Sequence, residues 1–248
     1  MSKTVISAAL IVIGDEILSG RTQDANLSYL AKWLNNCGVQ LVEARVILDD
    51  EDTIANTVNQ LRGYYNYVFT TGGIGPTHDD ITSASIAKAF GVDLVENAEA
   101  RALMLSYNPN DATPERMKMA HVPAGAKLIK NSISMAPGFQ MENVFVLAGI
   151  PAIMQAMLGA LDGEIEGAGK VISKTINAFV GESLLAADLG IVQESYPQTA
   201  IGSYPFYRNG VHGAALVVRS TDDDAINSAI DEIKVRLAKR NYRLEDDQ

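Results

Sequence analysis

Hydrophobic and polar residues follow one another along the first half of the chain in a pattern typical of strands that alternate with helices. Three apolar runs, Ala8–Ile13, Val39–Leu48 and Tyr67–Thr71, have the length of buried strands. Apolar residues three and four positions apart follow each run and predict helices, the first of them over Leu27–Leu34. Strands joined by single helices form parallel sheets covered on both faces. The pattern therefore predicts a three-layer α/β/α domain with a mainly parallel sheet.

The middle of the chain is less regular. Ala98–Tyr107 and Pro114–Ala120 have the spacing of helices. Two short apolar runs, Phe139–Met141 and Val144–Leu147, flank a turn and predict a hairpin. Pro151 then suits the first turn of a further helix, because proline is tolerated where no backbone N–H is needed.

A stretch rich in glycine and acids, residues 163–169, marks the predicted boundary between two domains. We expect the α/β domain at residues 1–165 and a second domain at residues 170–245. The order strand, helix, strand, strand, helix predicts a small α+β domain there. The acidic tail from Glu245 to Asp247 is expected to fray.

Composition excludes several classes of protein. The chain has 20 Lys and Arg against 30 Asp and Glu, a net charge of −10, which argues against a broad surface for nucleic acid or anionic membranes. One cysteine, Cys37, excludes an intrachain disulfide and favours a cytoplasmic location. The apolar start at Val5–Ile13 lacks a cleavage pattern and suits a first strand better than a signal peptide. The uncharged stretch Val144–Leu161 contains a Gly-Ile-Pro turn, so we predict no membrane span.

A glycine-rich loop between the third strand and the next helix is the most informative segment. Its glycines let the backbone approach a ligand closely, and the helix that follows offers free N–H groups to a phosphate. The loop matches neither the P-loop motif nor the dinucleotide motif G-x-G-x-x-G. The predicted phosphate-binding residues of this loop are Thr71, Gly72, Gly73, Gly75, Pro76 and Thr77.

Two acids close this loop. Carboxylates at Asp79 and Asp80 would repel a phosphate unless a divalent cation lay between them, because hard cations bind both kinds of oxygen. We therefore predict Asp79 and Asp80 as metal ligands and as catalytic residues. The alternative is that Asp80 caps the helix and Asp79 is merely solvated. His78 is a candidate for proton transfer, with an exposed loop histidine as its alternative.

Further polar residues follow the first and second strands. Gly14, Asp15 and Glu16 follow the first strand, with Asn26 beyond, and Asp49 ends the second. Since parallel strands end at one edge of a sheet, these groups are predicted to meet the glycine loop at a ligand site. A turn followed by an Asn or Asp helix cap is the alternative for the first group.

These motifs together resemble a known family, the MoaB/Mog molybdopterin-binding domains, and within it the CinA-type branch (competence/damage-inducible protein A). The resemblance spans about residues 5–165. A segment of the second domain also resembles eukaryotic FAD synthases, which carry a molybdopterin-binding domain. The motifs that carry the resemblance are Gly14-Asp15-Glu16-Ile17-Leu18-x-Gly20, Asp24-x-Asn26, Asp49-Asp50, Thr71–Thr82, Pro114-x-Arg116-x-Lys118-x-Ala120, Ala136-Pro137-Gly138-Phe139, Gly149-Ile150-Pro151 and, in the second domain, Ile201-Gly202-Ser203-Tyr204-Pro205.

The resemblance implies a domain that binds molybdopterin or a nucleotide. By position, Asp49 and Asp80 match acids essential in the Mog pattern, so Asp49 is a further predicted catalytic residue, and the three loop glycines match its phosphate loop. Pro137 and Gly138 are added as predicted ligand-binding residues. Ser132 and Ala148 stand where the CinA-type branch usually has proline. The family also implies a homo-oligomer, a dimer or a trimer.

The resemblance leaves three functions open. The first, which the CinA-type branch implies, is a pyrophosphatase that splits ADP-ribose or FAD-like dinucleotides with magnesium or cobalt, and with a monovalent cation as a further candidate cofactor. The second is a protein that binds molybdopterin without turnover. The third is a molybdopterin adenylyltransferase, which would consume ATP. In each case the partner is a small-molecule nucleotide or pterin.

Overall fold

The computed structural model describes residues 6–108, 112–208 and 210–246, and the chain divides into two compact units, residues 1–168 and 169–248. The first unit is built on a six-stranded sheet with the order β2-β1-β3-β8-β7-β6. The first four of these strands are parallel, and β7 and β6 are antiparallel to their neighbours. Their bounds are β1 Ser7–Ile13, β2 Gln40–Ile47, β3 Tyr67–Thr71, β6 Lys127–Ile129, β7 Gly138–Met141 and β8 Val144–Leu147.

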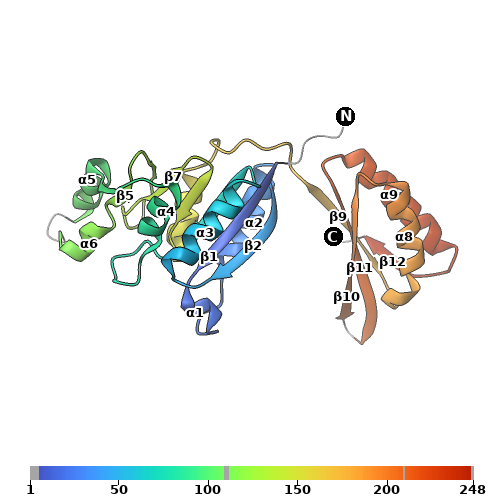
Figure 1. Ribbon diagram of the computed structural model, residues 1–248. Helices are drawn as coiled ribbons and strands as arrows, with labels where there is room; N and C mark the ends of the chain where they lie inside the picture. The colour runs from blue at the N-terminus through green and yellow to red at the C-terminus, as the bar shows by residue number, and fades with distance from the viewer. Residues whose placement is uncertain (1–5, 109–111, 209, 247–248) are drawn as a thin grey trace. The chain divides into compact units, whose positions relative to one another are not determined.

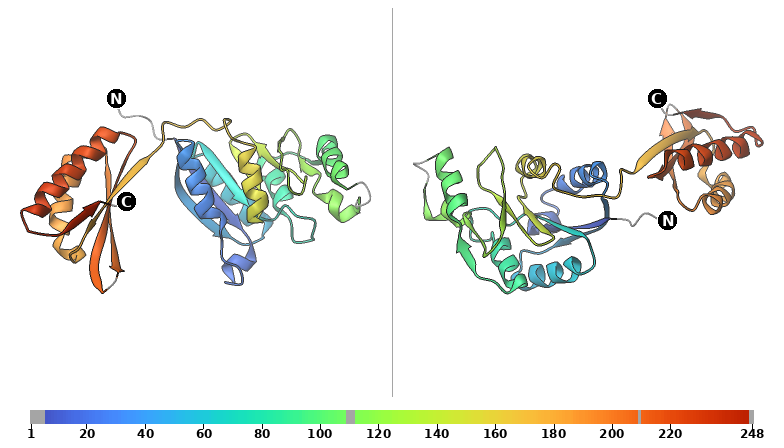
Figure 2. Two further views of the ribbon diagram at one scale, coloured as in Figure 1. Left: turned by 180° about the vertical axis from the view of Figure 1, so that it is seen from behind. Right: turned by 90° about the horizontal axis from the view of Figure 1, so that it is seen from above.

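Helices cover both faces of this sheet (Figure 1). On one face lie α2 (Asn26–Asn36) and α7 (Pro151–Gly159), and on the other lie α3 (Glu51–Arg62) and α4 (Thr82–Phe90). The view from above in Figure 2 shows α2 and α7 together on one side of the strands. The predicted three-layer α/β/α domain with a mainly parallel sheet is confirmed.

The central strand β1 explains why the first apolar run is continuous. Leu10 and Val12 pack under α2 and α7, whereas Ile11 and Ile13 pack under α3 and α4. A strand buried on both faces needs apolar residues at every position rather than at every second one.

A small satellite of the first unit was only partly predicted. It holds a two-stranded sheet, β4 (Leu94–Glu96) and β5 (His121–Pro123), next to α5 (Ala98–Tyr107) and α6 (Pro114–Lys118). Helix α6 is shorter than predicted, since Met119 and Ala120 already lead into β5. The satellite has a core of its own, made of Ala100, Met104, Met117 and Ala120.

The second unit is a four-stranded antiparallel sheet with the order β10-β11-β9-β12. Two helices, α8 and α9, pack on it. The elements are β9 Ile172–Ala178, the 3₁₀ turn η1 Glu182–Leu184, α8 Ala186–Ser195, β10 Ala200–Arg208, β11 Val211–Ser220, α9 Asp223–Ala238 and β12 Leu244–Asp246.

The expectation of a frayed tail is wrong for its described part. Leu244–Asp246 forms β12, which pairs with β9 from Ala178 to Ile176, while Asp247 lies outside the described residues. The backbone pairing overrides the acidic composition of the segment. Among the described residues, no helix combines the length and the apolar character that crossing a membrane requires.

Candidate functional site

The parallel strands β1, β2 and β3 end at one edge of the sheet, and a cleft of about 640 Å³ opens there. Loops after all three strands line it, together with the loop between β8 and α7. The predicted site residues that line the cleft are Gly14, Glu16, Asp49, Gly72, Gly73, Gly75, Pro76, Asp79, Asp80 and Pro137.

Two glycines of the loop have conformations that other residues rarely adopt. Gly72 has φ +105°, and a Cβ there would lie 2.1 Å from the carbonyl oxygen of Ile13. Gly73 has φ +68°, and its Cβ would lie 2.1 Å from the hydroxyl of Thr82. Both the backbone angle and the lack of space therefore require glycine.

Hydrogen bonds fix this loop against its neighbours. The N–H of Gly72 donates to the carbonyl of Leu147 (3.2 Å). Thr82 donates twice, from its hydroxyl to the carbonyl of Gly72 (3.0 Å) and from its N–H to the carbonyl of Gly73 (2.9 Å). Thr82 is also the first residue of α4, so the loop is held directly against the start of that helix.

Asp80 shapes the loop and does not cap the helix. Its carboxylate accepts hydrogen bonds from the N–H (2.8 Å) and the hydroxyl of Thr77. The residue in the N-cap position of α4 is Ile81, which makes no side-chain cap bond. A Cβ on Gly75 would lie 2.6 Å from Asp80 Oδ2, so glycine makes room for this carboxylate.

Asp15 and Asp49 join the ends of β1 and β2. The N–H of Asp15 donates to Asp49 Oδ2 (2.9 Å), and the N–H of Asp49 donates to Asp15 Oδ1 (3.2 Å). Asp15 starts the short helix α1 (Asp15–Leu18) and does not line the cleft. The N–H of Asp15 thus fixes the position of the Asp49 carboxylate from outside the cleft lining.

The cleft is strongly negative. Burial raises the pKa of Asp49 above its usual value, and the charges of Asp15, Glu16 and Asp79 raise it further. The pKa of Asp79 is lowered, chiefly by the nearby Thr77, although the hydroxyl of Thr77 donates to Asp80, and in smaller part by the charges of His78 and Lys118. Carboxylates from three separate loops therefore interact electrostatically at this edge of the sheet.

Several predicted site residues lie beside the cleft and do not line it. Thr71 is buried, with no hydrogen-bond partner for its hydroxyl among the described residues. Asn26 is buried and donates to the carbonyl of Gly149 (2.8 Å). Gly138 lies in β7, where a Cβ would meet the carbonyl oxygen of Val146. The side chain of His78 is 98% exposed, and its Nδ1 lies 3.8 Å from Asp79 Oδ1.

The sequence interpretation missed much of the cleft wall. Some of these residues, such as Ile13 and Met157, are apolar and have the pattern of core positions, and others, such as Ala136 and Ile150, lie in motifs of the resemblance without having been assigned to the site. The donation from Asn26 to Gly149 shows how one such loop is held in place. The unpredicted lining residues are Ile13, Thr22, Ile74, Met119, Ser134, Ala136, Ala148, Gly149, Ile150, Pro151, Ile153 and Met157.

The donor set of the cleft fits a metal ion shared with a phosphate. Among the described residues, no group of three or more His, Cys, Asp or Glu side chains is arranged to enclose a metal ion. Magnesium, however, usually binds one or two carboxylates and takes its other ligands from phosphate and water. Asp79 and Asp80 at the cleft wall provide donors of that kind.

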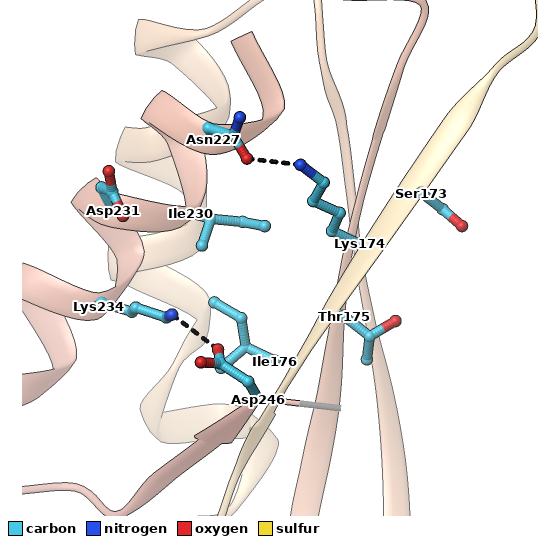
Figure 3. Close-up of a pocket in the computed structure, with 9 residues that line it drawn as sticks. All are labelled: Ser173, Lys174, Thr175, Ile176, Asn227, Ile230, Asp231, Lys234 and Asp246. Atoms are coloured by element: carbon cyan, nitrogen blue, oxygen red, sulfur yellow. Dashed lines mark hydrogen bonds and ion pairs between the residues drawn. The ribbon is translucent and has the colours of Figure 1, made fainter. Parts of the chain in front are cut away.

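The second unit has a groove of its own, about 490 Å³ between β9, α9 and β12 (Figure 3). Its two lysines already have partners within the chain. Lys174 donates to Asn227 (2.7 Å) and pairs with Asp223 (2.7 Å), and Lys234 pairs with Asp246 (2.7 Å). The groove therefore lacks the accumulation of like charge that distinguishes the cleft of the first unit.

Comparisons with known proteins agree with this architecture. Residues 9–163 match the family described as probable molybdopterin binding domain, and residues 170–245 match the middle domain of FAD synthase. A protein of Archaeoglobus fulgidus is 33% identical over 196 residues, which are 79% of this chain and 84% of that protein. A probable FAD synthase of Caenorhabditis elegans is 28% identical over 259 residues, 94% of this chain and 50% of that protein.

A solved structure gives the same result for the first unit. CinA of Thermoplasma acidophilum, described as a protein of unknown function, is 33% identical with a TM-score of 0.61 and covers 64% of this chain and 98% of its own. The chain spans about half the length of the worm FAD synthase. A small-molecule ligand is what this type of domain indicates. The predicted resemblance is confirmed, and the chain belongs to the molybdopterin-binding domain family, with CinA and FAD synthase among its relatives.

Proposed function

We propose that the cleft hydrolyses the pyrophosphate bond of a nucleotide such as ADP-ribose or FAD, with magnesium or cobalt as cofactor. The observation that carries this proposal is the crowding of Glu16, Asp49, Asp79 and Asp80 beside a glycine loop. Such carboxylates repel a diphosphate when no cation is present. A site built only to store an anion would have little use for them.

Each part of the cleft has a role in the proposed reaction. The backbone N–H groups of the glycine loop bind one phosphate, as oriented donors do where negative charge develops. Asp79 and Asp80 would hold the cation, which would neutralise the diphosphate and acidify a water molecule. Asp49, whose pKa is raised by burial, would accept a proton from the attacking water.

The balance of the reaction is simple. The oxygen of water attacks one phosphorus atom, and the bond from that phosphorus to the bridging oxygen breaks. The products are AMP and a second phosphomonoester, ribose 5-phosphate from ADP-ribose or FMN from FAD. The apolar wall around Ile13, Ile150 and Met157 suits the flat ring that these substrates share.

A charge-neutral substitution tests the proposal. We expect Asp80→Asn to lower AMP release from ADP-ribose or FAD at least a hundredfold, on the order of the loss of a catalytic electrostatic contact. The matched control is Asp93→Asn, which removes an exposed acid between α4 and β4, away from the cleft lining. Chromatographic detection of AMP with magnesium and with cobalt gives the readout. Equal turnover by Asp80→Asn and the control would reject the assignment.

A molybdopterin-binding protein without turnover is the second candidate. The apolar wall favours it, because a pterin ring and its phosphate would occupy the same two halves of the cleft. Calorimetry with molybdopterin, combined with absence of AMP release with either metal, would support this alternative. The predicted cytoplasmic location, monovalent cation and homo-oligomer stay predictions, and light scattering measures the last of them.

A further inference from the structure

A cleft that binds a diphosphate among four carboxylates needs positive charge from the protein as well. The motif Pro114-x-Arg116-x-Lys118-x-Ala120 is not used by the reaction described above, and it ends beside the cleft. Lys118 is the last residue of α6, and the next residue, Met119, lines the cleft.

The side chain of Lys118 reaches the glycine loop. Its ammonium group donates a hydrogen bond to the carbonyl of Thr77, between the lining residues Pro76 and Asp79. An ammonium group has three N–H donors. Thr77 is the acceptor that the described residues offer to one of them, so two donors are available to a ligand.

The same hydrogen bond holds the ammonium group beside the acidic end of the loop. Thr77, its acceptor, also donates from its N–H to the carboxylate of Asp80 (2.8 Å). Lys118 is exposed and belongs to the satellite, whose core is separate from the two large cores of the first unit. The side chain of Lys118 therefore reaches the cleft from α6 of the satellite and not from the six-stranded sheet.

We infer that Lys118 binds the diphosphate of the substrate directly, with two N–H groups on phosphate oxygens while the third stays on the carbonyl of Thr77. This inference rests on the proposed function for its substrate, a diphosphate diester. Lys118 should then contribute to substrate affinity and not to kcat, because the charge of the diphosphate that it binds is present both before and during the reaction.

Steady-state kinetics on the full chain tests the inference. We expect Lys118→Met to raise KM for ADP-ribose about tenfold to a hundredfold with kcat nearly unchanged, since a hydrogen bond to a charged group is lost. Lys118→Arg keeps the charge and should restore most of the affinity. Lys32→Met, which removes an exposed lysine of α2, is the matched control.

A binding experiment separates this inference from the proposed reaction. The probe is the ADP-ribose analogue with a methylene bridge between its phosphorus atoms, titrated with magnesium by calorimetry. Weaker binding to Lys118→Met, with no hydrolysis of ADP-ribose by the wild type, would support the role of Lys118 and reject the pyrophosphatase. Unchanged KM and unchanged analogue binding would overturn the role of Lys118, as would a fall in kcat alone, which indicates that the lysine only positions the loop.

Discussion

Two neighbouring acids of one sequence motif have opposite electrostatic environments. Asp49 is partly buried among other carboxylates, and its pKa is raised. Asp50 accepts from the N–H (2.8 Å) and the hydroxyl (2.6 Å) of Thr53, and its pKa is lowered. The pair shows that a shared position at the end of β2 does not imply a shared role. Only Asp49 lines the cleft.

Asp49 should cost the protein stability at neutral pH. When folding raises the pKa of an acid, the protonated form of that acid favours the folded state. This favourable contribution is complete below the unfolded pKa, near 4, and is lost as the pH rises through the folded pKa. We therefore expect Asp49→Asn to raise Tm at pH 7 by roughly 1–2 °C, a small shift because the group is partly exposed. Asparagine still offers an oxygen to the N–H of Asp15.

The measurement is a thermal melt from pH 3 to pH 8, with AMP release assayed in parallel. The difference in Tm between variant and wild type should shrink toward pH 3, where Asp49 is protonated in both states. AMP release should be lost although stability increases, because like charges held close together at a site lower the stability of the folded protein. A lower Tm for Asp49→Asn at pH 7 would contradict this account.

The sequence identified many of the residues at the site, but not the contacts that require those residue types. The loop glycines could be recognised from the sequence, but the contact of Gly72 with Ile13 joins segments far apart in the chain, and that of Gly73 with Thr82 depends on how the loop folds against the start of α4. The apolar wall was missed, since Met157 looks like an ordinary core position and Ile150 was matched only as part of a motif, with no role at the site. The meeting of the strand ends was predictable because parallel strands end at one edge of a sheet, whereas the apolar side chains that complete the cleft were not.

At the scale of elements, helix α3 begins with the Asp50 cap. The side chain satisfies the N–H of Thr53, one of the donors that a helix start leaves free. We expect Asp50→Ala to lower Tm by roughly 2–4 °C at pH 7, opposite in sign to the change at Asp49. Because the pKa of Asp50 is lowered on folding, this stability is present above about pH 4 and is lost at more acid pH.

Thermal melts of Asp50→Ala at pH 3 and pH 7, with Asp50→Asn as the matched variant, test the cap. Asparagine keeps an acceptor oxygen and should retain most of the stability at pH 7. AMP release should stay within about twofold of the wild type, because Asp50 does not line the cleft. Equal destabilisation by alanine and asparagine would argue against a capping role.

The elements that the sequence predicted well are those with a strong pattern of their own. Strand β3 has the predicted bounds Tyr67–Thr71, and the helices α2 and α3 follow their apolar spacing. Strands β4, β5, β6 and β12 have three residues each and exist through pairing with partners elsewhere in the chain. Three residues carry no measurable periodicity, so only the folded sheet reveals such strands.

At the scale of the whole molecule, each unit has a hydrophobic core of its own. Helices pack on both faces of the sheet in the first unit, whereas in the second unit α8 and α9 pack on a single face of the sheet. Units of a chain that have separate hydrophobic cores are expected to fold separately. The glycine-rich stretch that marked the predicted boundary contains the division between Ala168 and Gly169.

The first unit should therefore fold and act alone if it is cut at the right residue. Every residue that lines the cleft lies within 1–168. Its last residues still belong to it, since Ile165 is buried in the core and the N–H of Ala168 donates to the carbonyl of Gly38 (3.0 Å). We expect residues 1–168 to unfold in one cooperative transition and to keep AMP release within about twofold of the full chain.

A shorter fragment is the control for this cut. Residues 1–160 lack Leu161 and Ile165, two core side chains packed against the α2 and α7 face. Removing them should cost about 2–5 kcal/mol each and lower Tm by many degrees, because buried aliphatic groups and their packing are lost together. Calorimetry of the two fragments beside the full chain gives the comparison. An inactive but folded 1–168 fragment would show that the second unit contributes to the reaction, which the cleft by itself gives no reason to expect.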